Sequence, residues 1–99
     1  MKKRPDLVWC AQARADLLGI VDYISDDDPR AAQALLDEVE AKVGGLPDNP
    51  KKYALSKRAA GFRQLTVRDN YLLFYRLLGE ENPLVIEIAA VVHARRQWP

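Results

Sequence analysis

The sequence is poor in several residue types, and each shortage excludes a class of protein. Among its 99 residues there is one cysteine, Cys10, so neither an intramolecular disulfide nor a zinc site built from cysteines can form. Glycine and proline, with 5 and 6 residues, are too few for a collagen-like or low-complexity chain. No apolar run approaches the ~20 residues that a membrane-spanning helix requires.

What is present is typical of one folded domain. Hydrophobic residues make up 48% of the chain and charged residues 29%, which is enough apolar surface for a packed core. The basic N-terminus precedes only a short apolar stretch, 7–11, whereas a signal peptide needs an apolar region of ~7–15 residues and a small-residue cleavage site. We therefore expect a single domain over residues 1–99, mature from Met1, cytoplasmic, without membrane contact and without a cofactor or metal.

The net charge of +1 hides an asymmetry between the two halves of the chain. Residues 1–50 hold 6 Lys and Arg against 10 Asp and Glu, whereas residues 51–99 hold 9 against 4. A chain of this kind can present a basic face to nucleic acid or to an acidic protein while staying neutral overall. A mixed, solvated surface is the other interpretation.

Two helices are predicted from apolar spacing in the first half. After a β-prone run at 7–10, Ala13, Leu17, Ile20 and Ile24 follow one another at helical intervals, and this helix should end near residues 26–27. A second helix should begin at Asp28-Pro29, because Asp is a good N-cap and Pro suits the first helical position, and it should end at 44–45. The two helices should form a hairpin with a shared apolar seam.

After a basic loop at 46–60, the apolar period changes to two. It predicts strands at 62–67, 71–78 and 84–92, with turns at 68–70 and 79–83. Glu87 is the only charged residue of the third strand, so this strand should be central in the sheet. The predicted fold class is α+β, β-α-α-β-β-β: a strand, a helical hairpin and a three-stranded antiparallel meander. The helices should pack on one face of the sheet and leave the other relatively open.

In this order, the motifs resemble the ParE branch of the RelE/ParE toxin superfamily of bacterial type II toxin–antitoxin modules. The motifs that carry the resemblance are Ala13-x-x-Asp16-Leu17-x-x-Ile20-x-x-Tyr23-Ile24, Pro29-x-Ala31-Ala32, Leu46-x-x-x-Pro50, Gly61-x-Arg63-x-Leu65, Tyr71-x-x-x-Tyr75-Arg76 and the closing Val91-Val92-His93-Ala94-Arg95-Arg96-Gln97-Trp98-Pro99. Each motif is weak alone, and the C-terminal His-x-x-Arg-x-Trp-Pro is the best match to the ParE branch.

The resemblance implies a cognate antitoxin as partner and growth arrest as the outcome. In this family an antitoxin helix occupies an apolar groove and an extended segment lies on a sheet edge, which is a general mode of peptide recognition. The antitoxin-binding candidates lie on the two predicted helices; they are Leu17, Val21, Ile24, Leu35 and Leu36. They also build the seam against the sheet, so the sequence leaves open which of them an antitoxin could reach.

ParE-like toxins are described as inhibitors of DNA gyrase, whereas RelE-like toxins cut mRNA in the ribosomal A site. RNA cleavage needs a group that accepts the 2′-hydroxyl proton, a proton donor for the leaving oxygen, and cations for the phosphate. Two positions where RelE-like toxins carry cations fall near Leu65 and on Leu72 here, and no Tyr or His follows Arg96. A cleavage site made of Arg63, His93 and Arg95 is the alternative.

We therefore expect a binding-type inhibitor of gyrase, more a binding protein than an enzyme, which would meet DNA only through the antitoxin complex or gyrase. An antitoxin-binding member without toxicity is a further alternative. The target-binding candidates are Arg63, Tyr71, His93, Arg95, Arg96 and Trp98.

Several of these candidates also have a purely structural interpretation. Arg63 could pair with Glu87 across strands. Tyr71 could pack at the rim of the core, and Trp98 is expected to anchor the tail, because a free terminal Trp favours aggregation. Cys10 stands where related toxins often have a helix-capping Ser, and thiol redox control is a weaker hypothesis there.

Overall fold

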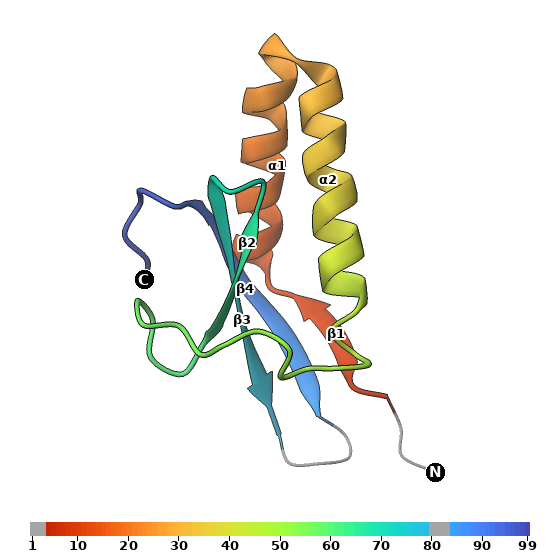
Figure 1. The fold of residues 1–99 in the computed structure, drawn as a ribbon, viewed down its shortest axis with the longest axis vertical. Helices are drawn as coiled ribbons and strands as arrows, with labels where there is room; N and C mark the ends of the chain where they lie inside the picture. The colour runs from red at the N-terminus through yellow and green to blue at the C-terminus, as the bar shows by residue number, and fades with distance from the viewer. Residues whose placement is uncertain (1–3, 80–83) are drawn as a thin grey trace.

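The computed structural model describes residues 4–79 and 84–99 and places the helices and strands in the predicted order (Figure 1). The elements are β1 (Asp6–Trp9), α1 (Ala11–Asp27), α2 (Pro29–Gly44), β2 (Arg63–Val67), β3 (Tyr71–Leu78) and β4 (Val85–His93). The predicted turn at 79–83 lies, apart from Gly79, outside the described residues. In the described part of the chain, no helix is both long and apolar enough to cross a membrane.

Local side chains define the ends of the helices as predicted. The Cys10 Sγ accepts a hydrogen bond from the Ala13 N–H at the start of α1. The Asp28 carboxylate accepts from the N–H groups of Arg30 and Ala31 at the start of α2, and Pro29 occupies the first turn. These acceptors satisfy backbone donors that the first helical turn leaves without partners. The reversal between the helices is therefore encoded locally, at Asp28-Pro29.

The four strands form one mixed sheet in the order β1-β4-β3-β2. β1 runs parallel to β4, whereas β2, β3 and β4 form the antiparallel meander. The β2–β3 turn places Arg68 and Asp69 at φ 53° and 61°, the left-handed geometry of a tight hairpin. β4 lies between β1 and β3, which confirms its predicted central place.

The helix-facing side of the sheet carries the larger core. Leu35 and Val39 of α2 pack there with Leu73, Tyr75 and Ile88 of the sheet, all nearly or fully buried. Figure 1 shows the two helices as a hairpin whose tip projects beyond the sheet. The hairpin base therefore builds the fold, while its tip extends past the strands.

The opposite face of the sheet is not open, and that expectation was wrong. Leu72 and Phe74 of β3 are buried there under the C-terminal segment and the end of the loop that joins α2 to β2, which extends to residue 62 and is called the 46–62 loop below. Trp98 stacks on Phe74 with ring centroids 4.7 Å apart and meets Phe62 edge-on at 4.9 Å. The strands alone would leave the apolar surface of these side chains exposed, and covering it removes that surface from water. The expected anchoring of Trp98 is confirmed.

Candidate target-binding and antitoxin-binding surfaces

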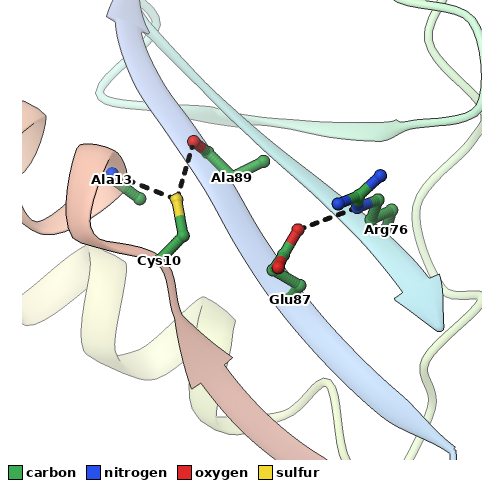
Figure 2. Close-up of polar contacts among 5 residues, drawn as sticks. All are labelled: Cys10, Ala13, Arg76, Glu87 and Ala89. Atoms are coloured by element: carbon green, nitrogen blue, oxygen red, sulfur yellow. Dashed lines mark hydrogen bonds and ion pairs between the residues drawn. The ribbon is translucent and has the colours of Figure 1, made fainter.

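One edge of β4 changes partner along its length. β1 pairs with β4 only from Val85 to Ile88, and beyond that point α1 supplies the partners. The Cys10 Sγ donates to the Ala89 carbonyl oxygen at 3.3 Å, as Figure 2 shows. Six residues further along the chain, the Asp16 Oδ2 of α1 accepts from the Val91 N–H at 3.1 Å. The side chains of the N-cap residue Cys10 and of Asp16 thus take the place of a neighbouring strand on this edge of β4.

A groove of about 610 Å³ runs between this part of α1 and the end of β4. It is lined by Ala15, Asp16, Gly19, Ile20, Tyr23, Tyr71, Val91, Val92, His93 and Arg96. A Cβ built on Gly19 would meet no atom within 4 Å, and the Tyr23 side chain is 76% exposed. The groove is therefore open on the α1 side, with small residues on its wall.

Three target-binding candidates meet at the sheet end of this groove. The Tyr71 ring contacts the His93 ring edge-on, with centroids 5.4 Å apart. The backbone N–H of Arg95 donates to the His93 Nδ1 at 3.1 Å, so neutral His93 carries its proton on Nε2. The Arg96 backbone N–H donates to the His93 carbonyl oxygen at 2.8 Å. The tail therefore turns tightly at His93 and holds Tyr71, His93 and Arg96 along one wall.

A second hollow, of about 400 Å³, lies beside the tail and is lined by Arg58, Arg95, Arg96, Gln97 and Trp98. Arg58 comes from the 46–62 loop, and its Nη1 donates to the Ala94 carbonyl oxygen at 2.6 Å. The lining contains no acidic residue, and none of its three arginines forms an ion pair with any residue that the structure describes. The result is a concentration of positive charge with no counterion among residues 4–79 and 84–99.

Arg63 lies apart from the other target-binding candidates. Its Nη1 donates to the Tyr53 carbonyl oxygen at 2.7 Å, which holds the 46–62 loop against β2. The suggested pair with Glu87 does not form, because β3 lies between β2 and β4. Glu87 instead accepts from the Arg76 Nε at 2.8 Å, from its register partner on β3 (Figure 2).

The strand registers also separate the groups of the alternative cleavage site. Arg63 is opposite Tyr75, whereas His93 is opposite Tyr71. Four residues of β3 separate these two positions, or about 13 Å along the strand. The structure therefore brings His93 and Arg95 together and leaves Arg63 elsewhere.

The two leucines at the expected cation positions are part of the cores. Leu65 is 2% exposed and Leu72 4% exposed, and they lie in the clusters on opposite faces of the sheet. Tyr75 is fully buried, and its hydroxyl donates to the Pro50 carbonyl oxygen at 2.9 Å. Burial raises the pKa of the Tyr75 hydroxyl above its ordinary value.

The antitoxin-binding candidates divide according to their burial. Leu35 is 1% exposed, at the centre of the core, and Leu36 is half-buried. Leu17, Val21 and Ile24 of α1 are half-buried and pack against the same core. They form the inner margin of α1, between the core and the surface.

Three residues matter to these surfaces that the sequence did not single out for them. Asp16 appeared in a motif, but its bond to a strand 75 positions away has no local signal. Arg58 was one of several loop cations, and only the fold brings it to the tail. Nothing in the sequence around Gly19 indicates that the space beside its Cα is empty.

The family model described as the ParE toxin of the type II toxin–antitoxin system parDE matches residues 7–98, nearly the whole chain. The chain belongs to the ParE toxin family. It is thus a toxin of a type II toxin–antitoxin system, as the dispersed motifs and the β-α-α-β-β-β fold predict.

Two relatives and three solved structures resemble this ParE-family toxin. Protein Y4kP of Sinorhizobium fredii, named as a candidate toxin, is 31% identical over 97% of this chain and 95% of its own length. Toxin RelE2 of Caulobacter vibrioides is 30% identical over 91% of this chain and 96% of its own length.

Among solved structures, the chromosomal ParDE system of P. aeruginosa matches with a TM-score of 0.72 and 22% identity, over 91% of this chain and 96% of that one. A YoeB/ParE toxin of Agrobacterium tumefaciens matches with a TM-score of 0.62 and 15% identity, over 89% of this chain and 96% of that one. The RelBE2 toxin–antitoxin complex of Mycobacterium tuberculosis matches with a TM-score of 0.58 and 26% identity, over 92% of this chain and 99% of that one. These likenesses cover the whole domain and support one shared fold.

Proposed function

We propose that this ParE-family toxin arrests growth by binding DNA gyrase, without a chemical step of its own, and that a cognate antitoxin neutralises it. The observation that carries the proposal is the separation of Arg63 from His93 by about 13 Å along β3. A cleavage site needs its proton acceptor, proton donor and phosphate-binding cations around one phosphate. This arrangement favours a contact inhibitor over an mRNA-cleaving enzyme.

The proposed contact surface for gyrase is the end of the sheet from which the tail leaves. Tyr71 and His93 contact each other there, Arg95 and Arg96 follow directly, and Trp98 anchors the tail on Phe74. An anchored tail loses less conformational entropy on binding than a free one. Arg63 stands outside this surface and serves the 46–62 loop.

The proposed antitoxin site is the groove between α1 and β4. Its wall combines small residues such as Gly19 with the exposed Tyr23 ring, and the 64%-exposed Leu18 lies on the adjoining face of α1. An amphipathic helix of an antitoxin would find apolar anchors here in Ile20 and Tyr23, whereas the expected candidates Leu17 and Val21 pack against the core and do not line the groove. Two of the structural relatives belong to toxin–antitoxin systems, ParDE and RelBE2, which supports a partner of this kind.

Gyrase inhibition is tested by supercoiling of relaxed plasmid in the presence of the purified toxin. We expect inhibition with trapped cleaved DNA, and loss of that inhibition in the double variant Arg95→Gln/Arg96→Gln. Lys51→Gln/Lys52→Gln is the matched control, because it removes the same charge from exposed residues outside the tail. Full supercoiling at saturating toxin, with the protein folded and able to bind its antitoxin, would refute the gyrase proposal.

The remaining functions are separated by two further measurements. Cuts in mRNA on translating ribosomes would establish the RelE-like activity instead. Unimpaired growth after induction without antitoxin, at confirmed soluble levels, would establish a member that only binds its antitoxin.

The antitoxin site is tested at Gly19. A side chain added there meets no atom within 4 Å, so Gly19→Arg should fold normally and fill the groove. Gly44→Arg is the control, since Gly44 also has empty surroundings but lies at the end of α2. We expect the antitoxin to raise the Tm of the Gly44 variant as in the wild type, because it binds only the native state, and to leave that of the Gly19 variant unchanged. Equal stabilisation of both variants would move the antitoxin site elsewhere.

A further inference from the structure

The hollow beside the tail has the chemistry of an anion site. Arg58 comes from the loop, and Arg95 and Arg96 from the tail, so two segments distant in sequence bring three arginines to the lining of one space of about 400 Å³. No acidic residue lines it, and among described residues none of the three is in an ion pair. Unpaired arginines are suited to phosphate oxygens, because the guanidinium presents five N–H donors in a fixed plane.

The cluster is held in place by the fold. Arg58 uses one nitrogen for the Ala94 carbonyl oxygen, at 2.6 Å, and its other donors remain. The backbone N–H groups of Arg95 and Arg96 both bond to His93, which fixes the turn that carries them. The arginines therefore extend from an ordered backbone.

The positive charge continues into an adjoining hollow. Arg58 also lines the neighbouring space of about 540 Å³, where Lys57 and Lys42 lie. Lys42 is engaged by Glu38 and the Thr66 carbonyl oxygen, whereas Lys57 is exposed and in no ion pair with a described residue. The cations thus follow a path over two hollows that share Arg58.

We infer that this path, Lys57, Arg58, Arg95 and Arg96, binds the phosphodiester backbone of a nucleic acid. Several separate cations in adjoining hollows can each contact a different phosphate of the same strand. In the hollow beside the tail, which holds Arg95 and Arg96, the aromatic ring that could anchor a protein partner, Trp98, is already packed on Phe74 and Phe62. These observations favour a nucleic acid over an acidic protein segment.

The inference deepens the proposed function, on which it rests, because gyrase acts on DNA. It predicts that the toxin touches the DNA that gyrase holds as well as the enzyme itself. The contact is to phosphates, so affinity should depend on salt and little on sequence.

The test measures DNA binding without gyrase, by fluorescence anisotropy of a short labelled duplex titrated with the full-length toxin. We expect binding that weakens steeply between about 50 and about 200 mM salt. Arg95→Gln/Arg96→Gln should lower the affinity at least about tenfold and reduce the slope of log K against log salt by about 2, one unit for each lost phosphate contact. Lys51→Gln/Lys52→Gln removes the same charge outside both hollows and should change the affinity less than threefold.

Parallel titrations with single-stranded DNA and with RNA of the same sequence identify which phosphodiester is preferred. Equal losses in the two double variants, or no binding by the wild type, would overturn the inference. Tighter binding of poly-L-glutamate than of all three nucleic acids would also overturn it, in favour of an acidic protein. Because gyrase is absent, failure here is separate from failure of supercoiling inhibition, and circular dichroism confirms that both variants are folded.

Discussion

Replacing Asp16 with alanine should destabilise the protein by an amount that follows from one hydrogen bond. Asp16 Oδ2 accepts from the N–H of Val91, a residue only 2% exposed, on the edge of β4 that β1 no longer covers. Without the carboxylate, this buried donor has no partner, at a cost of about 1–3 kcal/mol. The lost Gln12 contact to Oδ1 is exposed and adds little.

Part of that cost is masked by helix propensity, which favours Ala over Asp by up to about 0.7 kcal/mol. Asp22→Ala, at an exposed position of the same helix, measures this gain alone. Asp16→Asn keeps an acceptor oxygen on a side chain of the same length, and we expect its free energy of unfolding to fall by less than about 1 kcal/mol.

Urea denaturation followed by circular dichroism measures these differences. With an m-value of about 1–1.5 kcal/mol/M, a cost of about 1–3 kcal/mol lowers the midpoint of Asp16→Ala by about 0.7–3 M relative to Asp22→Ala. Equal midpoints for the Ala and Asn variants of Asp16 would refute the reasoning. So would an Asp16→Ala midpoint equal to that of the wild type.

Three other perturbations test the remaining supports of the two surfaces. Trp98→Ala removes a ring that covers Phe74, so we expect a loss of about 2–4 kcal/mol in the free energy of unfolding, measured in urea, and binding of a hydrophobic dye would report the exposed face. Glu38→Gln removes the carboxylate whose pKa lies below its ordinary 4.5, held down mainly by the hydrogen bond from the Arg68 N–H at 2.7 Å. A carboxyl group whose pKa is lowered by folding stabilises the fold at any pH above its unfolded-state pKa. The free energy of unfolding of the wild type should therefore exceed that of Glu38→Gln by about 1 kcal/mol at pH 7, and the Tm values of the two proteins should converge as the pH falls below 4.5. Tyr75→Phe leaves the core filled but deletes the hydroxyl bond to the loop, so a loss of about 1 kcal/mol is expected in urea melts, and no loss would mean that this bond is dispensable.

Features encoded by neighbouring residues were predicted well from the sequence. The helix start at Asp28-Pro29 needs only the side chain of Asp28 and the fixed φ of proline. The turn was predicted at 68–70 because Asp and Asn tolerate positive φ; Asp69 adopts it, and so does Arg68, a residue type for which it is uncommon. The hydrophobic character of β4 indicated its central place.

The partners of individual charges could not be predicted in the same way. Glu87 pairs with Arg76 and not Arg63 because β3 separates β2 from β4. The order of strands in a sheet cannot be predicted from the residues of one strand alone. The bond of Asp16 to Val91 depends on β1 ending four residues into its pairing with β4. Of the six target-binding candidates, the sequence named the five that gather near the tail and also Arg63, which lies apart.

The sequence by itself determined the elements, their order and the family, because apolar periodicity, helix caps and dispersed motifs are local or additive properties of the chain. Only the tertiary structure decided which sheet face the tail covers and where its cations collect. The physical reason is distance along the chain: Trp98 meets Phe62 and Phe74, and Arg58 meets the tail at Ala94, through contacts that form only once the sheet exists.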